Sequence, residues 1–351
     1  MNRYILSALL VGLIGTVLQG AVWAGGCRID DSRLQTASSF KLHLGDDCTE
    51  RDRQARTVAA ADILAAMAKG RAVDLSGVVV SGDLSLDSLP LAPLPADLEP
   101  VIGQREEARV IAGSWSIVKS VVRGTIRHRS PQGILVVKGP VTFSETRFEQ
   151  LVDLSRVVFL EPVIWSAAVF LQESYFVQGK FLRDVFAEQT AFGPHTRFHR
   201  SHFHGPVSFQ QSGFSGMAEF LEVEFDRDAN FSRTYYKLGT GFSGSRFHGL
   251  ADFSETRFDR EAFFTFTRFG GDAFFNRATF RSTVDFDDAE FMGRDDFSKV
   301  LFEGEATFLR VKRPTTSPEV LGVGNPQVQY VITLSLLVFS AMLIAYLIRS
   351  R

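Results

Sequence analysis

Between residues 141 and 305 the chain repeats an eleven-residue pattern of large apolar, small and polar positions. The third and eighth positions of each unit are large, so the steps between them alternate between five and six residues. A helix needs apolar residues three and four apart, and a long strand needs sustained alternation, which here lasts only three residues. The pattern instead predicts a solenoid, in which short strands point side chains inward and polar residues turn the corners.

Phenylalanine fills 26 of the 30 large positions in these fifteen units; the exceptions are Leu154, Trp165, Ala187 and Tyr236. With Phe308, 27 of the 33 phenylalanines in the 351-residue chain share one register. A repeat of this kind determines the architecture. The most regular part is expected to form a stacked core of ten rings: Phe242, Phe247, Phe253, Phe258, Phe264, Phe269, Phe275, Phe280, Phe286 and Phe291.

The units, with a small residue, a polar residue, Phe and often Ser in succession, resemble the pentapeptide repeat family. The resemblance is to the Phe-centred form with an extra residue in every second unit, and it covers well over half of the chain. It implies an all-β fold, a right-handed quadrilateral parallel β-helix with the phenylalanines stacked inside.

The number of residues in one coil is either 11 or 22, which corresponds to one repeat unit or to two. Arg246, Arg257 and Arg268 share one place in successive units, as do Asp285 and Asp296. With one unit per coil these like charges would stack directly on one another, which is unfavourable. The charges therefore favour two units per coil, although Arg246 and Arg268 would still stack.

The same register can be continued towards the N-terminus with aliphatic residues, which predicts a regular array over residues 108–310. The large positions would be Val110, Trp115, Val121, Ile126 and Val137, with Gln132 as the exception. Proline and glycine are frequent in residues 311–327, which predicts an extended linker.

A solenoid needs its ends covered. Residues 25–72 are expected to form a capping segment, with a helix over residues 50–69, because that stretch is rich in Ala and Arg and lacks Pro and Gly. Early strands and a Pro-rich loop are expected over residues 73–107. Cys27 and Cys48 are the only cysteines, and in an oxidising compartment they are most simply a disulfide.

The two ends of the chain predict where in the cell the protein is located. Residues 1–24 are apolar after Arg3 and end in Val22-Trp23-Ala24, which indicates a secretory signal peptide. An uncleaved anchor, or a lipoprotein signal ahead of Cys27, is the alternative. Residues 328–348 are long and apolar enough for a transmembrane helix, and the arginines of the tail 349–351 predict a cytoplasmic C-terminus. A removable sorting tail is the alternative there.

Charge and motifs exclude several classes of function. Lys and Arg number 38 and Asp and Glu 40, so the chain has no basic excess for nucleic acid. No nucleophile-elbow, phosphate-loop or zinc-protease motif occurs, so neither an enzyme nor a cofactor is expected. Some members of the family that this chain resembles mimic DNA and bind topoisomerase, and the acidic clusters of this chain suggest the same role. The predicted topology and the arginines between the acidic residues disfavour that role.

Two groups of residues are candidates for a binding surface. His195, His199, His202 and His204 lie within ten residues, and imidazoles suit Zn, Cu or Ni. A solvated surface run is the alternative, since His199 and His204 are expected on different faces. Outside the core register, the aromatic residues expected at outward positions are Phe186, Phe263, Phe266 and Phe274. Exposed apolar groups mark protein or homo-oligomer contacts; packing beneath side chains or loops is the alternative.

Together these observations predict an exported protein with a single membrane span, whose rigid solenoid acts as a structural scaffold or protein-interaction surface. Its partner would be another protein or a second copy. The alternatives are a metal-binding surface protein that uses the histidines, and a topoisomerase-binding DNA mimic.

Overall fold

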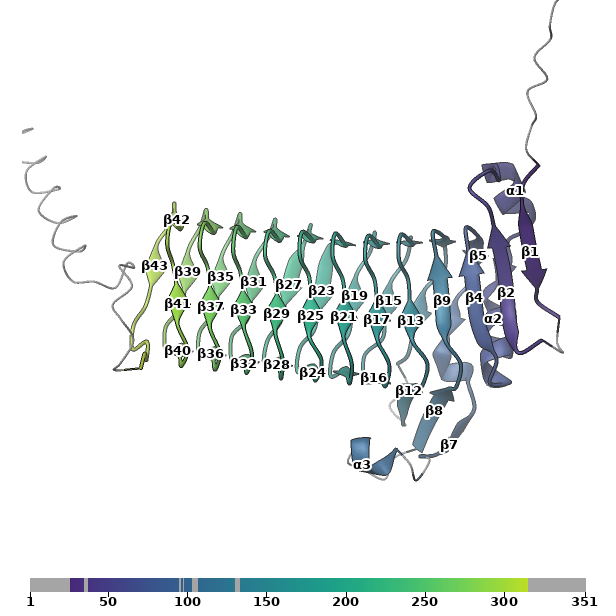
Figure 1. Ribbon diagram of the computed structural model, residues 1–351, viewed down its shortest axis with the longest axis horizontal. Coiled ribbons are helices and arrows are strands. Elements are labelled where there is room, and N and C mark those ends of the chain that lie inside the picture. The colour runs from purple at the N-terminus through teal and green to yellow at the C-terminus, as the bar shows by residue number, and fades with distance from the viewer. Residues whose placement is uncertain are drawn as a thin grey trace, which may run out of the picture.

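The computed structural model describes residues 26–34, 37–94, 96, 98–102, 107–129 and 133–314. These residues form a stack of coils that runs from the N-terminal end to the C-terminal end of the rod (Figure 1). The expected signal peptide, residues 1–24, and the expected transmembrane helix, residues 328–348, lie outside the described residues. Within the described part of the chain, no helix is long and apolar enough to cross a membrane.

The coils have four sides, which we call faces A, B, C and D, and each face is one sheet. Face A contains β1 (Ile29–Ser32), β2 (Ser39–Leu44), β4 (Ala72–Ser76), β9 (Trp115–Val118), β13 (Val141–Thr142), β17 (Val163–Ile164), β21 (Val185–Phe186), β25 (Val207–Ser208), β29 (Ala229–Asn230), β33 (Ala251–Asp252), β37 (Ala273–Phe274) and β41 (Asp295–Asp296). Face B contains β3 (Val58–Ala59), β5 (Val79–Ser81), β10 (Val121–Val122), β14 (Arg147–Phe148), β18 (Val169–Phe170), β22 (Ala191–Phe192), β26 (Gly213–Phe214), β30 (Tyr235–Tyr236), β34 (Arg257–Phe258), β38 (Thr279–Phe280) and β42 (Leu301–Phe302).

Face C contains β6 (Leu84–Ser85), β11 (Ile126–Arg127), β15 (Val152–Asp153), β19 (Ser174–Tyr175), β23 (His195–Arg197), β27 (Met217–Glu219), β31 (Thr240–Gly241), β35 (Ala262–Phe263), β39 (Val284–Asp285) and β43 (Ala306–Thr307). Face D contains β7 (Leu91–Pro93), β8 (Glu107–Ile111), β12 (Ile134–Val137), β16 (Val157–Phe159), β20 (Lys180–Phe181), β24 (His202–Phe203), β28 (Glu224–Phe225), β32 (Arg246–Phe247), β36 (Arg268–Phe269) and β40 (Glu290–Phe291). Every pairing is parallel except β1 with β2 and β7 with β8.

One coil of the regular part contains two repeat units, as the charges predicted. Val141 pairs with Val163, and Phe247 with Phe269, so equivalent residues lie two units apart along the chain. Arg246 pairs with Arg268, but Glu224 and Glu290 flank this pair in the same ladder. Opposite charges therefore flank this unfavourable stack on both sides.

The backward extension of the register to residue 108 is wrong, because the early coils are longer. Trp115 pairs with Val141 and Val73 pairs with Trp115, so the offsets between equivalent positions are 26 and 42 in place of 22. Trp115 and Ile126 therefore occupy the small position before the large one, and the buried large residues are Ile111, Ile117 and Val122. Val110 and Val121, which the register predicted to be inside, are only partly buried.

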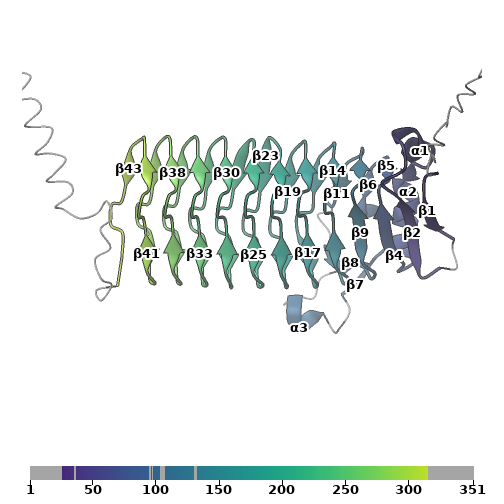
Figure 2. The same ribbon diagram turned by 45° about the horizontal axis from the view of Figure 1, so that its top comes forward.

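The extra residues of the coils with offsets of 26 and 42 enter at the corner between faces C and D. The longer insertion, residues 87–110, contains β7, α3 (Glu99–Ile102) and most of β8, and we call it the excursion. It projects from one side of the rod (Figure 2). Leu94, Leu98 and Ile102 of the excursion form a small second core with Val136 and Val158 of face D.

The single helix predicted over residues 50–69 is also wrong. The structure has α1 (Glu50–Ala55), then β3, then α2 (Ala60–Ala68). The break occurs because Val58 is fully buried and pairs with Val80 as the first strand of face B, which outweighs local helix propensity. In α2, Ile63 and Met67 are buried in the same core as the phenylalanines.

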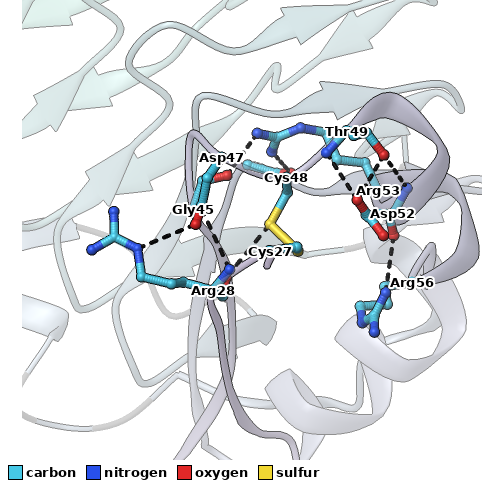
Figure 3. Close-up of a disulfide and its surroundings, with 10 residues drawn as sticks. Cys27, Arg28, Gly45, Asp47, Cys48, Thr49, Asp52, Arg53 and Arg56 are labelled. Atoms are coloured by element: carbon cyan, nitrogen blue, oxygen red, sulfur yellow. Dashed lines mark hydrogen bonds and ion pairs between the residues drawn. A yellow bond between two sulfur atoms is a disulfide. The ribbon is translucent and has the colours of Figure 1, made fainter. Parts of the chain in front are cut away.

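A disulfide and polar contacts hold the N-terminal segment together, and Arg53 joins it to the first coils (Figure 3). Cys27 and Cys48 form a disulfide. Thr49 and Asp52 form a capping box at the start of α1. The Arg53 side chain donates hydrogen bonds to the carbonyl oxygens of Gly77 and Gly45, the second at 2.9 Å. The loop before α1 is therefore fixed at both ends.

Stacked aromatic rings fill the interior. The ten rings expected in the core are all buried, each at most 1% exposed. Rings in successive coils are nearly parallel, as for Phe231 and Phe253 at 5.0 Å between centroids, whereas neighbours within a coil meet edge to face, as for Phe253 and Phe264 at 5.4 Å. Both arrangements are favourable for aromatic quadrupoles. The core is thus a continuous column of rings.

Two of the four corners have left-handed backbone. From Glu145 (φ 54°) to Arg310 (φ 56°) a positive φ occurs once in every repeat unit, and Gly244 (φ 72°) is the only glycine in this series. The others are mostly long polar residues, and several pair with their equivalents one coil away, such as Arg200 with Glu222 at 2.8 Å. The corners therefore support ladders of side chains on the outside of the rod.

Tyr236 is the one tyrosine in the column, and its buried hydroxyl has no hydrogen-bond partner among the described residues. Burial raises the pKa of this phenol well above its ordinary value. Because Phe214 and Phe258 stack on both sides of the ring at 5.0 and 4.9 Å, phenylalanine fits there without rearrangement. Tyr236→Phe is expected to raise the free energy of unfolding by about 1–2 kcal/mol, measured by urea denaturation. The matched change Phe258→Tyr should lower it, and a less stable Tyr236→Phe protein would contradict this account.

His128 occupies an inward position of face C, between Leu86 and Leu154 in successive coils. Its side chain is 1% exposed; Nδ1 lies 3.2 Å from the Ser155 carbonyl oxygen and Nε2 lies 3.9 Å from Asp87. Burial is the largest influence on the pKa of this imidazole and lowers it below 6.5. The Ser155 carbonyl and Asp87 act to raise the pKa, whereas Arg109 and Arg156 act to lower it. The unfolded chain therefore binds the proton more readily than the folded one, and stability that is present above pH 6.5 is lost as the pH falls below it.

The expected result is a larger fall in melting temperature between pH 7.5 and pH 5.5 for the wild type than for His128→Leu. Leucine matches the residues at the equivalent positions of the neighbouring coils, so the variant should remain folded. An equal fall in both proteins would show that His128 does not carry the acid sensitivity.

Candidate functional site

Face D has two outward positions in each coil, one before and one after the inward phenylalanine. In three successive coils the inward residues are Phe203, Phe225 and Phe247, all at most 1% exposed. The positions before them contain His202, Glu224 and Arg246, which pair in register. The positions after them contain His204, Asp226 and His248, again one coil apart. Two columns that contain imidazole and carboxylate groups, with Arg246 at the end of one, thus lie side by side.

The side chains of these columns contact one another closely. His202 Nε2 lies 2.8 Å from Asp226 Oδ1, and His204 Nδ1 lies 2.8 Å from Asp226 Oδ2. The two imidazole rings stack with centroids 3.8 Å apart. We call His202, His204, Glu224, Asp226 and His248 the face D cluster.

Glu224 joins the remaining histidine to this arrangement. His248 Nε2 lies 3.1 Å from Glu224 Oε1, and the other oxygen of Glu224 lies 4.0 Å from His202 Nδ1. The cluster is therefore a chain of alternating imidazoles and carboxylates, from His248 through Glu224, His202 and Asp226 to His204. Its members are partly buried except His248, which is exposed.

The Asp226 carboxyl group is the centre of the cluster. Burial raises its pKa, but the hydrogen bonds and positive charge of His202 and His204 outweigh burial, so the pKa lies below the ordinary value. The carboxylate is therefore ionised at neutral pH and has two imidazoles within hydrogen-bonding distance.

The four histidines predicted from the sequence do not form one site. The structure brings His202 and His204 together, whereas His195 lies on face C and contacts Glu219 at 2.9 Å. His199 lies at the corner between faces C and D, separate from His204 as expected. Proximity in sequence was misleading because the chain turns a corner between these residues.

His248, Glu224 and Asp226 were not predicted as partners of the histidines. Their signal was the period of the coil, since Asp226 and His248 follow His204 at intervals of 22 and Glu224 follows His202 at the same interval. A search for chemistry along the repeat, in place of a search along the chain, would have found them.

A groove borders the cluster on its N-terminal side. Residues of the excursion and of face D line it, among them Ile102, Lys180, His202 and Glu224. The Lys180 ammonium group donates a hydrogen bond to the Ile102 carbonyl oxygen at 3.1 Å, so it is directed towards the excursion. The excursion and the cluster therefore lie next to each other on one face.

The four aromatic residues predicted at outward positions lie in different places. Phe186 and Phe274 are on face A and Phe263 is on face C, as a coil of two repeat units requires. Phe274 lies at an outward position, as predicted, but it is only partly exposed because the Arg294 guanidinium group covers its ring at 5.3 Å. Phe266 is 67% exposed and has a φ of 55°, in the left-handed region that bulky residues rarely adopt.

Phe263 and Phe266 form a pair beside two glycines. The residues one coil earlier are Gly241, which pairs with Phe263, and Gly244 at the left-handed corner. Neither glycine has a side chain to cover the rings, so both rings remain exposed. We call Phe263 and Phe266 the aromatic edge.

Comparison of the chain with family models, with curated proteins and with solved structures gives no match. The fold itself defines the class: an all-β, four-sided parallel solenoid with an aromatic core, consistent with the architecture that the pentapeptide repeat resemblance implies.

Proposed function

We propose that this protein is an exported, membrane-anchored scaffold of the pentapeptide repeat type, whose solenoid is a rigid surface for another protein of the cell envelope. The observation that carries the proposal is the aromatic edge, two exposed rings beside two glycines on an otherwise regular rod. Exposed apolar groups of this kind mark interaction sites. A strained left-handed phenylalanine indicates a functional constraint, because a glycine or polar residue suits that corner better.

The regularity of the rod favours a scaffold over an enzyme. From residue 141 to residue 305 every coil has the same length, so no long loop builds an active site there. Opposite charges pair at several corners, as for Arg233 with Glu255 and Arg310 with Asp288. A DNA mimic needs a more continuous anionic surface, so these ion pairs count against that alternative.

The N-terminal segment and the disulfide support the remaining parts of the proposal. In this proposal β1, α1 and α2 cap the first coil, the coils wind in the right-handed sense, and residues 328–348 anchor the rod. A disulfide is stable in an oxidising compartment, which agrees with export. Protease treatment of spheroplasts is expected to digest the solenoid; a protected solenoid would overturn the topology.

The partner is tested by crosslinking in intact cells. A photoreactive amino acid at position 266 is expected to give a crosslinked product, whereas the same amino acid at Gln211, at a left-handed corner on another side of the rod, should give none. A product of twice the chain's mass would assign the edge to a second copy, and equal or absent crosslinking at both positions would overturn this interface.

A further inference from the structure

The face D cluster has the composition and spacing of a transition-metal site. His202, His204 and Asp226 each offer a ligand atom, and these atoms lie within 4.8 Å of one another. Neighbouring ligand atoms of a tetrahedral zinc ion are roughly 3.3 Å apart, given metal–ligand distances of about 2.0–2.1 Å. The two contacts of 2.8 Å between Asp226 and the imidazoles need only small side-chain movements to reach that geometry.

The two imidazoles and the carboxylate of the cluster converge. The rings of His202 and His204 stack with centroids 3.8 Å apart, and each Asp226 oxygen faces a nitrogen of one ring. Imidazole nitrogen and carboxylate oxygen are ligands that zinc binds.

The outer residues are arranged as a supporting shell. Metal-binding histidines usually donate their other ring N–H group to a carboxylate, which fixes the tautomer and the orientation of the ring. Glu224 lies 4.0 Å from Nδ1 of His202, on the side opposite the Asp226 contact, and is itself held by His248 at 3.1 Å. Metal binding at Nε2 would displace its proton and leave the proton on Nδ1, facing Glu224.

The platform beneath the cluster is rigid. His202 and His204 flank Phe203, and Asp226 follows Phe225, and these two buried rings stack at 5.2 Å. The strands that carry them pair in register. Side chains on regular strands over a packed core are positioned more precisely than side chains on loops.

We propose that His202, His204 and Asp226 bind one divalent transition-metal ion of the zinc class on face D, with Glu224 and His248 as positioning residues. Imidazole nitrogen with carboxylate oxygen suits Zn²⁺, Cu²⁺ or Ni²⁺ better than Ca²⁺ or Mg²⁺, which prefer oxygen ligands. This metal site shares no residue with the aromatic edge: its ligands lie on face D, whereas Phe263 lies on face C and Phe266 at the corner between faces C and D.

The test is titration of the tag-free, full-length protein in detergent with Zn²⁺ against a chromophoric chelator, followed by X-ray absorption spectroscopy of the zinc-loaded protein. We expect one Zn²⁺ per chain, bound by two imidazoles and oxygen ligands, and His204→Gln or Asp226→Asn should weaken binding at least 100-fold. Glu224→Gln should weaken it by about 10–100-fold, the range typical of a supporting residue.

His195→Gln is the matched control, because His195 also contacts a glutamate, Glu219, on another face. It should leave zinc affinity unchanged, and circular dichroism should show that every variant keeps its sheet content. The proposal is overturned if the wild type binds no zinc, if His204→Gln and His195→Gln have equal effects, or if the spectrum shows only oxygen ligands.

Discussion

Replacing Phe258 with alanine is expected to lower the free energy of unfolding by about 3–5 kcal/mol. The ring is fully buried and lies between Tyr236 at 4.9 Å and Phe280 at 4.6 Å in the coils on either side. Phe264 meets it edge to face at 6.1 Å. Neighbouring coils are fixed by their own strands and cannot close the cavity. The loss therefore includes both the free energy of transferring the ring out of water and the cost of the cavity that remains. Urea denaturation followed by circular dichroism measures the loss.

Phe266→Ala is the control for this substitution. That ring is 67% exposed, so its removal is expected to change the free energy of unfolding by less than about 0.5 kcal/mol. Similar losses in the two variants would mean that the inward and outward assignments of the repeat are incorrect.

Gly216→Ala is expected to have the second largest effect, a loss of about 3 kcal/mol. A β-carbon at this position would lie 1.6 Å from the carbonyl oxygen of Pro194 and 2.1 Å from its carbon. These are backbone atoms of the preceding coil, next to the ladder in which His195 pairs with Met217. Relief of the clash would therefore separate two paired strands. Thermal and urea unfolding of the variant measure the effect.

The control lies three residues away in the same coil. A β-carbon at Gly213 would have no atom within 4 Å, and its backbone is not left-handed. Gly213→Ala is expected to leave stability unchanged or to raise it by less than about 1 kcal/mol, since alanine restricts the unfolded chain. If Gly213→Ala destabilised the protein as much as Gly216→Ala, the clash with Pro194 would not be the cause.

The repeat could be predicted from the sequence because each Phe position reports the same local geometry. The ladder offset of two repeat units and the burial of Phe258 and Phe264 follow from that regularity. The register before residue 141 could not be predicted, since insertions at one corner change the coil length without interrupting the apolar pattern. Val58 shows the same limit: its strand depends on a partner, Val80, that is remote from the local helix signal.

The face D cluster shows what sequence proximity cannot reveal. His195 and His204 are close in the chain but belong to different faces, whereas His204 and Asp226 are 22 apart and in contact. The coil length determines which residues that are distant in the sequence are close in space. Once the length of a coil is known, the cluster can be read directly from the chain.

The coil length also determines how the rod would respond to a pulling force along its axis. At the C-terminal end of the rod each coil pairs only with its neighbouring coils, so the last one can detach while the others remain folded. One coil is two repeat units, the length of chain between paired residues such as Arg268 and Glu290. When it detaches, this length of chain can extend to about 75 Å. A force between the two ends would therefore be relieved in equal steps through the regular part of the rod, and each step lengthens the molecule by many times the spacing of the coils.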